Sequence, residues 1–189
     1  MKKIIFISLL TILCVQAYPQ MQKGDLTVGL KGGYVYSPHY YDDSQYGFDV
    51  AYNISDPFEI VFTGMMNPNI SYLLKDNSGN KNYNLAVYSA NLDFRLYLIH
   101  MQTWATGPAL GGQYYIVNNT TNSVYNSKAL GFNLGWHVRV NLTDNLQLNG
   151  GWRYTNAKAK NTANWWDDST TDISYNLFYI GVAYSFQIK

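Results

Sequence analysis

The sequence predicts an all-β fold, namely an eight-stranded antiparallel up-and-down transmembrane β-barrel. The first observation is the segment 128–142, where apolar and polar residues alternate with a period of two, as in a strand with one apolar face. The second is length, because this alternation outruns the ~5–6 residues of an ordinary strand and suits the ~9–11 needed to cross a bilayer. The third is that no later segment approaches the ~18 continuous apolar residues of a membrane helix, and a membrane protein without such a helix must be a closed barrel.

The alternation leaves open which face of the strand points inward. A soluble barrel would bury the apolar residues from Leu130 to Leu142, whereas a membrane barrel would turn them toward lipid. The polar face of this strand and the next carries small residues between its charges, namely Ala129, Gly131, Gly135 and Gly151. Small residues make room for a few large polar side chains in a narrow lumen. The sequence therefore favours a polar interior and an apolar outer face.

The same alternation predicts eight strands, at residues 25–37, 45–54, 58–66, 84–99, 103–117, 128–142, 146–155 and 172–188. Residues 70–74 are a candidate continuation of the third strand past a bulge. Another bulge is expected at Pro108, since proline cannot donate to a ladder. Short turns at 54–57, 99–103 and 142–146 alternate with long loops at 38–44, 67–83, 118–127 and 156–171. This asymmetry predicts short periplasmic turns and longer extracellular loops.

The N-terminus is predicted to be a secretory signal peptide, residues 1–17, followed by one barrel domain, residues 18–189. Two lysines precede an apolar run, and the residues up to Ala17 suit a cleavage site. The only cysteine is Cys14, and Leu13 before it is too bulky for a lipoprotein signal. Cleavage after Ala17 leaves no cysteine, so neither a disulfide nor a thiolate site is expected.

Composition narrows the function classes. Without the two lysines of the predicted signal, 11 basic residues face 12 acidic ones, a net charge of −1. This balance excludes the basic footprint of a nucleic-acid-binding protein. Charged residues make up 13% of the chain and aromatic residues 16%, whereas about 25% charged is usual for soluble domains. The composition accords with a membrane barrel.

The charged residues of the predicted strands share the parity assigned to the lumen. The set is Lys31, Asp49, Glu59, Asp93, Arg95, Arg139 and Arg153, with His137 on the same face. Eight strands leave an interior just wide enough for side chains, and buried charges must pair. We therefore expect a closed charge network in the lumen, with Asp93 and Glu59 as partners of Arg95 and Arg139. Lys128 lies on the outer parity, at the predicted extracellular rim.

The last strand and one short motif carry a resemblance to a known family. The run Val182–Phe186 and the phrase Gly107–Gly112 are similar to the small OmpA/OmpX-type barrels and the "porin-family" outer-membrane β-barrel domain proteins of Gram-negative bacteria. The resemblance implies a protein of the cell outer membrane, in contact with its lipid and expected to be a monomer. It also implies that the terminal aromatic strand is the insertion signal read by the barrel assembly machinery, although residues 187–189 follow Phe186 here. A wall-tethering role is not expected.

Three functions are compatible with these residues. The favoured one is a non-enzymatic outer-membrane barrel with a side-chain-filled lumen, a structural role and surface contacts through its loops. The second is a narrow pore for small solutes. The third is a lipid- or peptide-modifying enzyme that uses residues of the first long loop, namely Ser37, His39, Asp42, Asp43 and Ser44.

Two tryptophans in the last long loop are the most suggestive binding feature. Trp165 and Trp166 stand beside two aspartates, and exposed aromatic side chains are candidates for anchoring a protein or glycan. The alternative is that they fold back onto the aromatic girdle at the barrel rim. No cofactor or metal site is expected, since no cluster has metal-ligand spacing.

Overall fold

A computed structural model describes residues 23–37, 43–76, 79–101, 103–119, 127–161, 170–172 and 174–187. The predicted signal peptide at 1–17 lies outside these ranges. So do His39, Asp42, Trp165 and Trp166. Among the described residues, no helix is long and apolar enough to span a membrane.

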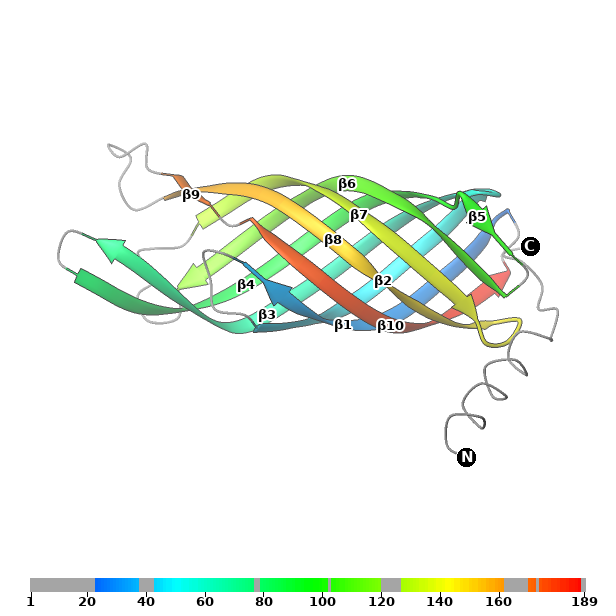
Figure 1. Ribbon diagram of the computed structural model, residues 1–189, viewed down its shortest axis with the longest axis horizontal. Coiled ribbons are helices and arrows are strands. Elements are labelled where there is room, and N and C mark those ends of the chain that lie inside the picture. The colour runs from blue at the N-terminus through cyan, green and yellow to red at the C-terminus, as the bar shows by residue number, and fades with distance from the viewer. Residues whose placement is uncertain are drawn as a thin grey trace, which may run out of the picture.

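Eight long strands wrap into a closed antiparallel barrel (Figure 1). They are β1 (Asp25–Tyr36), β2 (Asp43–Ser55), β3 (Phe58–Asp76), β4 (Gly79–Leu96), β6 (Trp104–Asn119), β7 (Ser127–Asn141), β8 (Leu146–Asn161) and β10 (Tyr175–Gln187). Two short strands, β5 (Ile99–His100) and β9 (Thr170–Asp172), pair with β6 and β8. Each long strand pairs with its neighbours in the chain, and β10 pairs with β1 from Asp25↔Gln187 to Tyr36↔Asn176. The predicted eight-stranded up-and-down barrel is confirmed.

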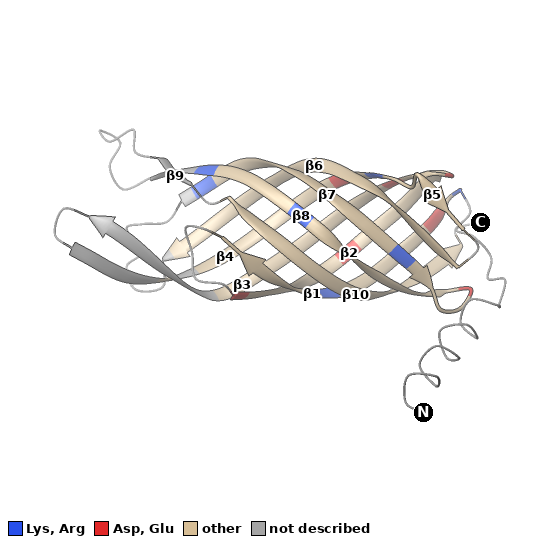
Figure 2. Cartoon of the chain, in the orientation of Figure 1, with Lys and Arg blue, Asp and Glu red and all other residues tan. Residues whose placement is uncertain are grey.

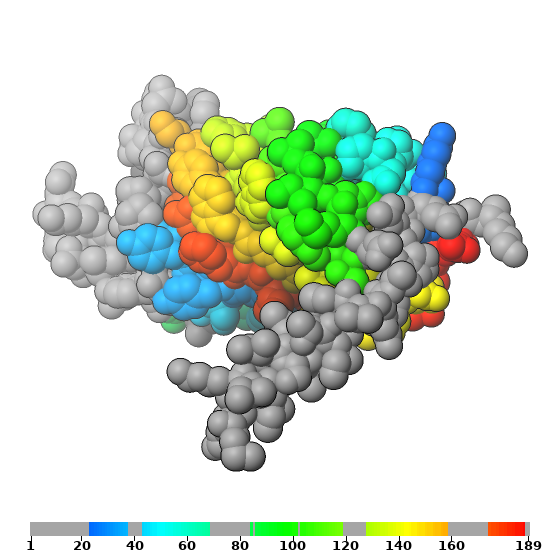
Figure 3. Space-filling model, turned by 45° about the vertical axis from the view of Figure 1, so that its right-hand side comes forward, coloured from blue at the N-terminus to red at the C-terminus, as the bar shows by residue number. Residues whose placement is uncertain are grey.

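The two faces of each strand differ as a period of two requires. In β10, buried and exposed residues alternate from Leu177 to Phe186. In β7, the outer residues Leu130, Phe132, Leu134, Trp136, Val138 and Val140 are all exposed, from 78% at Leu130 to 37% at Val140. Figure 3 shows such side chains of β6 (green), β7 and β8 (yellow) covering the outer wall. The apolar face is therefore the outer face.

The two ends of the barrel differ in how the strands are joined. At one end, here called the turn end, β2 and β3, β7 and β8, and the termini of β1 and β10 come together. In the turn between β7 and β8, the side chain of Thr143 accepts the N–H groups of Asn145 (3.3 Å) and Leu146 (3.0 Å). A threonine that folds back on its own turn in this way fixes the connection in a few residues. The opposite end, here called the loop end, carries the longer connections.

Several predicted loops are shorter than expected, because the strands run on. The residues 67–83 are mostly strand, since β3 and β4 continue to pair up to Asp76↔Gly79. The register shifts between Asn67 and Ile70, so the expected continuation of the third strand past a bulge is confirmed. This hairpin extends beyond the rest of the barrel (Figure 1). β8 likewise continues to Asn161 and pairs with β9, so the predicted loop 156–171 begins too early.

The bulge expected at Pro108 falls on the neighbouring strand. The register of β6 with β7 is regular through Pro108↔Trp136. On the other side of β6, pairing passes from Arg95↔Ala109 to Ile99↔Thr106, so one more residue lies on the β4–β5 side than on the β6 side. Proline has no N–H to donate there. The extra residue appears where the ladder loses that bond.

Candidate functional site: the interior of the barrel

The eight ionisable residues predicted for the lumen are all buried inside the barrel and are spread over six strands. Figure 2 shows basic and acidic positions on several of the strands. None is more than 6% exposed, and His137 is fully buried. We call this set the ionic cluster: Lys31, Asp49, Glu59, Asp93, Arg95, His137, Arg139 and Arg153. Burial of so many charges requires that each finds partners.

Asp49 and Glu59 each hold more than one basic group. Lys31 Nζ lies 2.7 Å from Asp49 Oδ1, and Arg95 Nη2 lies 3.5 Å from Asp49 Oδ2. Arg95 also reaches Glu59, with Nη1 at 3.1 Å from Oε2. Glu59 in addition faces Arg139, at a longer 3.8 Å. The cluster is therefore a chain of shared contacts rather than a set of separate pairs.

Asp93 pairs across the barrel with Arg153. Arg153 Nη2 lies 2.5 Å from Asp93 Oδ2, and Asn133 Nδ2 donates to Asp93 Oδ1 at 3.2 Å. The expected pairing of Asp93 with Arg95 or Arg139 is wrong, whereas that of Glu59 with both arginines is right. Neighbouring positions on one strand do not determine the partner, because the tilt of the strands brings side chains of distant strands to one level.

Two tyrosines that the sequence analysis did not single out complete the cluster. His137 Nδ1 lies 3.0 Å from the hydroxyl of Tyr179, and His137 Nε2 lies 3.4 Å from Arg95 Nη1. The Tyr179 ring also packs under Lys31, whose Nζ is 5.0 Å from the ring centre. Tyr97 donates to Glu59 Oε2 at 2.9 Å while Arg139 stacks on its ring at 4.4 Å. Tyr179 has the inward-facing parity of its strand, and this sequence signal could have identified it as a lumen residue.

The loop-end half of the interior holds a group of apolar and tyrosine side chains among uncharged polar ones such as Gln45 and Gln113. Its buried residues form one contiguous group, here called the apolar cluster: Val35, Met65, Val87, Tyr115, Val117, Ala129, Ala157, Tyr175 and Leu177, in contact with Tyr179. Leu177 and Tyr115 are fully buried. A polar interior was expected throughout, and this half corrects that expectation. The lumen is thus filled by two chemically different layers.

Inner glycines are pressed against these layers. A side chain at Gly151 would place its Cβ 2.8 Å from the Tyr179 hydroxyl. At Gly111 the added atom would meet the Asp93 carboxylate and the backbone of Leu92. Real Cβ atoms do not approach other atoms so closely, so only glycine fits at either position. The small inner residues make room for the ionic cluster.

The residues of the first long loop are not brought together as a catalytic group in the part of the chain that the structure describes. Ser37 is buried and donates to the carbonyl of Ser174 at 2.9 Å. The Asp43 carboxylate accepts the N–H of its neighbour Ser44 at 2.6 Å. No group of three or more His, Cys, Asp or Glu side chains that could hold a metal occurs among the described residues.

The closed barrel and its outward apolar belt define a class, the β-barrels of bacterial outer membranes. The family model for the outer membrane protein beta-barrel domain matches residues 5–186 of the chain. The protein belongs to this family, and its location is the cell outer membrane. No curated protein sequence matches the chain.

Solved structures share the fold at low identity. OprG from Pseudomonas aeruginosa is 15% identical and aligns over 89% of this chain and 98% of its own, with a TM-score of 0.62. Neisserial surface protein A is 13% identical over 87% of this chain and 98% of its own, with a TM-score of 0.58. AlkL, solved in lipid bilayers, is 17% identical over 92% and 97%, with a TM-score of 0.54. These likenesses establish the fold alone.

Proposed function

We propose that the protein is a non-enzymatic outer-membrane barrel whose lumen is closed by its own side chains. The observation that carries the proposal is the ionic cluster, in which residues of six strands meet across the lumen. An eight-stranded barrel encloses little more than the volume of its inward side chains. Lys31 and Arg153 lie over the ring of Tyr179, and His137 is bonded to its hydroxyl, so these side chains occupy that volume. A solute would have to displace paired, buried charges to pass.

The absence of catalysis is part of this proposal. The inward ionisable groups are buried and engaged with one another, which leaves them poorly placed to reach an external substrate. Ser37, the one hydroxyl of the first loop that the structure describes as buried, is bound to the Ser174 carbonyl. A structural role in the membrane, together with contacts through the loop end, is the function that these features support. Insertion would be through the barrel assembly machinery, as in other members of such families.

Conductance in planar bilayers tests the closed lumen. The purified full chain should give no single-channel steps above those of protein-free membranes. Tyr179→Ala, which removes the ring at the centre of the cluster, serves as the positive control for an opened interior. Discrete steps from the unchanged protein would overturn the proposal in favour of a narrow solute pore.

Labelling on intact cells tests which end faces outward. The mature chain is expected to contain no cysteine, so single-cysteine variants can be labelled without background. Ser44→Cys, at an exposed position in the loop-end part of β2, should react with a membrane-impermeant maleimide on intact cells. Asp144→Cys, in the turn between β7 and β8, should react only after permeabilisation. The reverse pattern would show that the loop end faces the periplasm.

A further inference from the structure

Two exposed lysines lie close together on the outer wall, at the loop end of β7 and β8. The basic residues Lys31, Arg95, Arg139 and Arg153 are inside the barrel, whereas Lys128 and Lys158 are exposed on its outer face. Lys128 pairs in register with Lys160. The ladder around it places Lys158 opposite Leu130, a diagonal neighbour of Lys128. Lys128 and Lys158 bring two exposed positive charges to neighbouring positions of the sheet, where they repel each other, and an anion bound between them would relieve this repulsion.

A groove in the outer wall has Lys158 as one of its lining residues. It measures about 360 Å³ and is lined by Leu130, Gly131, Phe132, Asn156, Ala157 and Lys158. The pairing of β7 with β8 is interrupted there, between Lys128↔Lys160 and Gly131↔Ala157. One end of the groove is therefore cationic and its floor is apolar.

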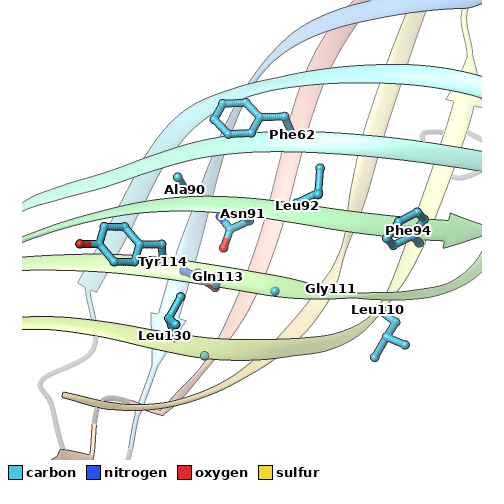
Figure 4. A pocket seen from close by; sticks show the side chains of 12 residues that line it. Phe62, Ala90, Asn91, Leu92, Phe94, Leu110, Gly111, Gln113, Tyr114 and Leu130 are labelled. Carbon is cyan, nitrogen blue, oxygen red and sulfur yellow. The ribbon is translucent and has the colours of Figure 1, made fainter. Parts of the chain in front are cut away.

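A larger depression adjoins the groove. This depression of about 610 Å³ shares Leu130 and Gly131 with the first groove and runs across β3, β4, β6 and β7. Figure 4 shows Tyr114, Leu130, Leu110 and Phe94 standing around it. Gly112 lines it without a side chain, and an added Cβ would find no heavy atom closer than 4.0 Å, at Gly131 O. The wall is hollowed here because Ala90 and Gly112 leave space between the larger outer side chains.

We propose that these two adjoining depressions together bind one phosphorylated lipid of the outer membrane. The phosphate lies at Lys128 and Lys158, and an acyl chain follows Leu130 and Tyr114 to the hollow at Gly112. The lysines stand at the edge of the apolar belt, the level at which basic side chains meet lipid headgroups. The backbone of Lys158 pairs with that of Asp172 on β9. The inference goes beyond the proposed function, since it concerns the outer wall and not the lumen.

A lipid is the occupant that both halves of the site select. A soluble anion would use the lysines and leave the apolar hollow without a purpose. A partner protein would have to contact Leu92, Phe94 and Leu110, which are exposed in the lipid-facing belt of the wall. A phosphorylated amphiphile carries both a phosphate for the lysines and a hydrocarbon chain for the depression.

Native mass spectrometry of the full chain in detergent tests the cationic end. The probes are dioleoyl phosphatidic acid and dioleoylglycerol, which share their chains and differ in the phosphate. Phosphatidic acid should bind more tightly, and Lys128→Gln with Lys158→Gln should weaken it about 25-fold, about fivefold for each lysine. Lys23→Gln makes the charge change of one of these two substitutions at the turn end and should leave binding unchanged.

The apolar half has its own pair of variants. Gly112→Leu fills the hollow and should reduce retention of phosphatidic acid severalfold. Gly32→Leu is the matched control, because Gly32 also has open space, with the nearest atom 3.8 Å from an added Cβ, but lies outside the groove. Equal binding of the two lipids, displacement of phosphatidic acid by equimolar inorganic phosphate, or equal binding by all variants would each overturn the proposal. Wild-type conductance would leave it intact and overturn only the closed lumen.

Discussion

The two halves of the lumen are built on the same parity of the same strands, yet they hold together by different means. Toward the turn end, the ionic cluster joins charges from six strands through contacts such as Lys31–Asp49 and Arg153–Asp93. Toward the loop end, the apolar cluster packs Tyr115, Leu177 and their neighbours without charge. An inward side chain of a small barrel therefore need not be polar. What the interior requires is that its volume is filled and that each charge has a partner.

The difference has an energetic side. In the ionic cluster a buried charge is destabilising unless its partner is present. The loss of unfolding free energy on substitution therefore depends on whether an unpaired charge remains. In the apolar cluster the damage depends on the volume removed. Substitutions matched between the two halves should separate these terms.

The largest effect is expected in the ionic cluster. Asp93→Leu leaves the Arg153 guanidinium buried without its carboxylate and should lower the free energy of unfolding by about 4 kcal/mol. Urea unfolding of the barrel in detergent micelles measures this. Asp144→Leu, which removes an exposed carboxylate from a turn, should change stability little. If Asp93→Leu were equally mild, the charges would not be coupled.

Leu177→Ala probes the apolar cluster. The fully buried side chain leaves a cavity on truncation, and the loss should be about 3 kcal/mol. The same unfolding experiment applies, with Ile180→Ala as control on the outer face of the same strand, where Ile180 is 67% exposed. Equal losses at the two positions would mean that the loop end is loosely packed.

Val138→Arg tests whether the outer wall tolerates a guanidinium group as the lumen tolerates that of Arg139. Val138 lies between His137 and Arg139 but faces outward. In bilayers the variant should cost roughly 2 kcal/mol, since the charge meets hydrocarbon near the midplane. The loss should shrink in short-chain detergent, where water reaches the wall. A loss that is the same in both media would indicate that Val138 contacts protein and not lipid.

The smallest effect is expected when both members of a pair are removed. Asp93→Leu combined with Arg153→Leu replaces a buried ion pair by apolar side chains, and stability should return to within about 1 kcal/mol of the unchanged protein. A double-mutant cycle on unfolding free energies gives the coupling. A double variant as unstable as Asp93→Leu alone would show that apolar side chains cannot replace this buried ion pair.

The sequence was sufficient for the strands and the faces, because a period of two is local information. Lys31, Asp49 and Arg139 could be placed inside from their parity alone. The partner of Asp93 could not, since Arg153 reaches it across the lumen through the tilt and stagger of strands that are distant in the chain. The apolar cluster was not predicted, because the apolar pattern of the strands that carry Tyr115 and Leu177 is defined by their outward-facing residues. Residues 67–83 resembled a loop because asparagine, proline and glycine are frequent there, yet each strand of the hairpin supplies the other with hydrogen bonds.

The seam between β1 and β10 determines how the molecule can come into being. Its paired residues, Asp25 with Gln187 at one end and Tyr36 with Asn176 at the other, lie almost a whole chain apart. Closing so long a loop is slow compared with forming a hairpin. A chain that lacked its last strand would present two unpaired sheet edges, a template for aggregation in water and a severe penalty in hydrocarbon. The barrel is therefore closed only when β10, the last strand, has paired with β1.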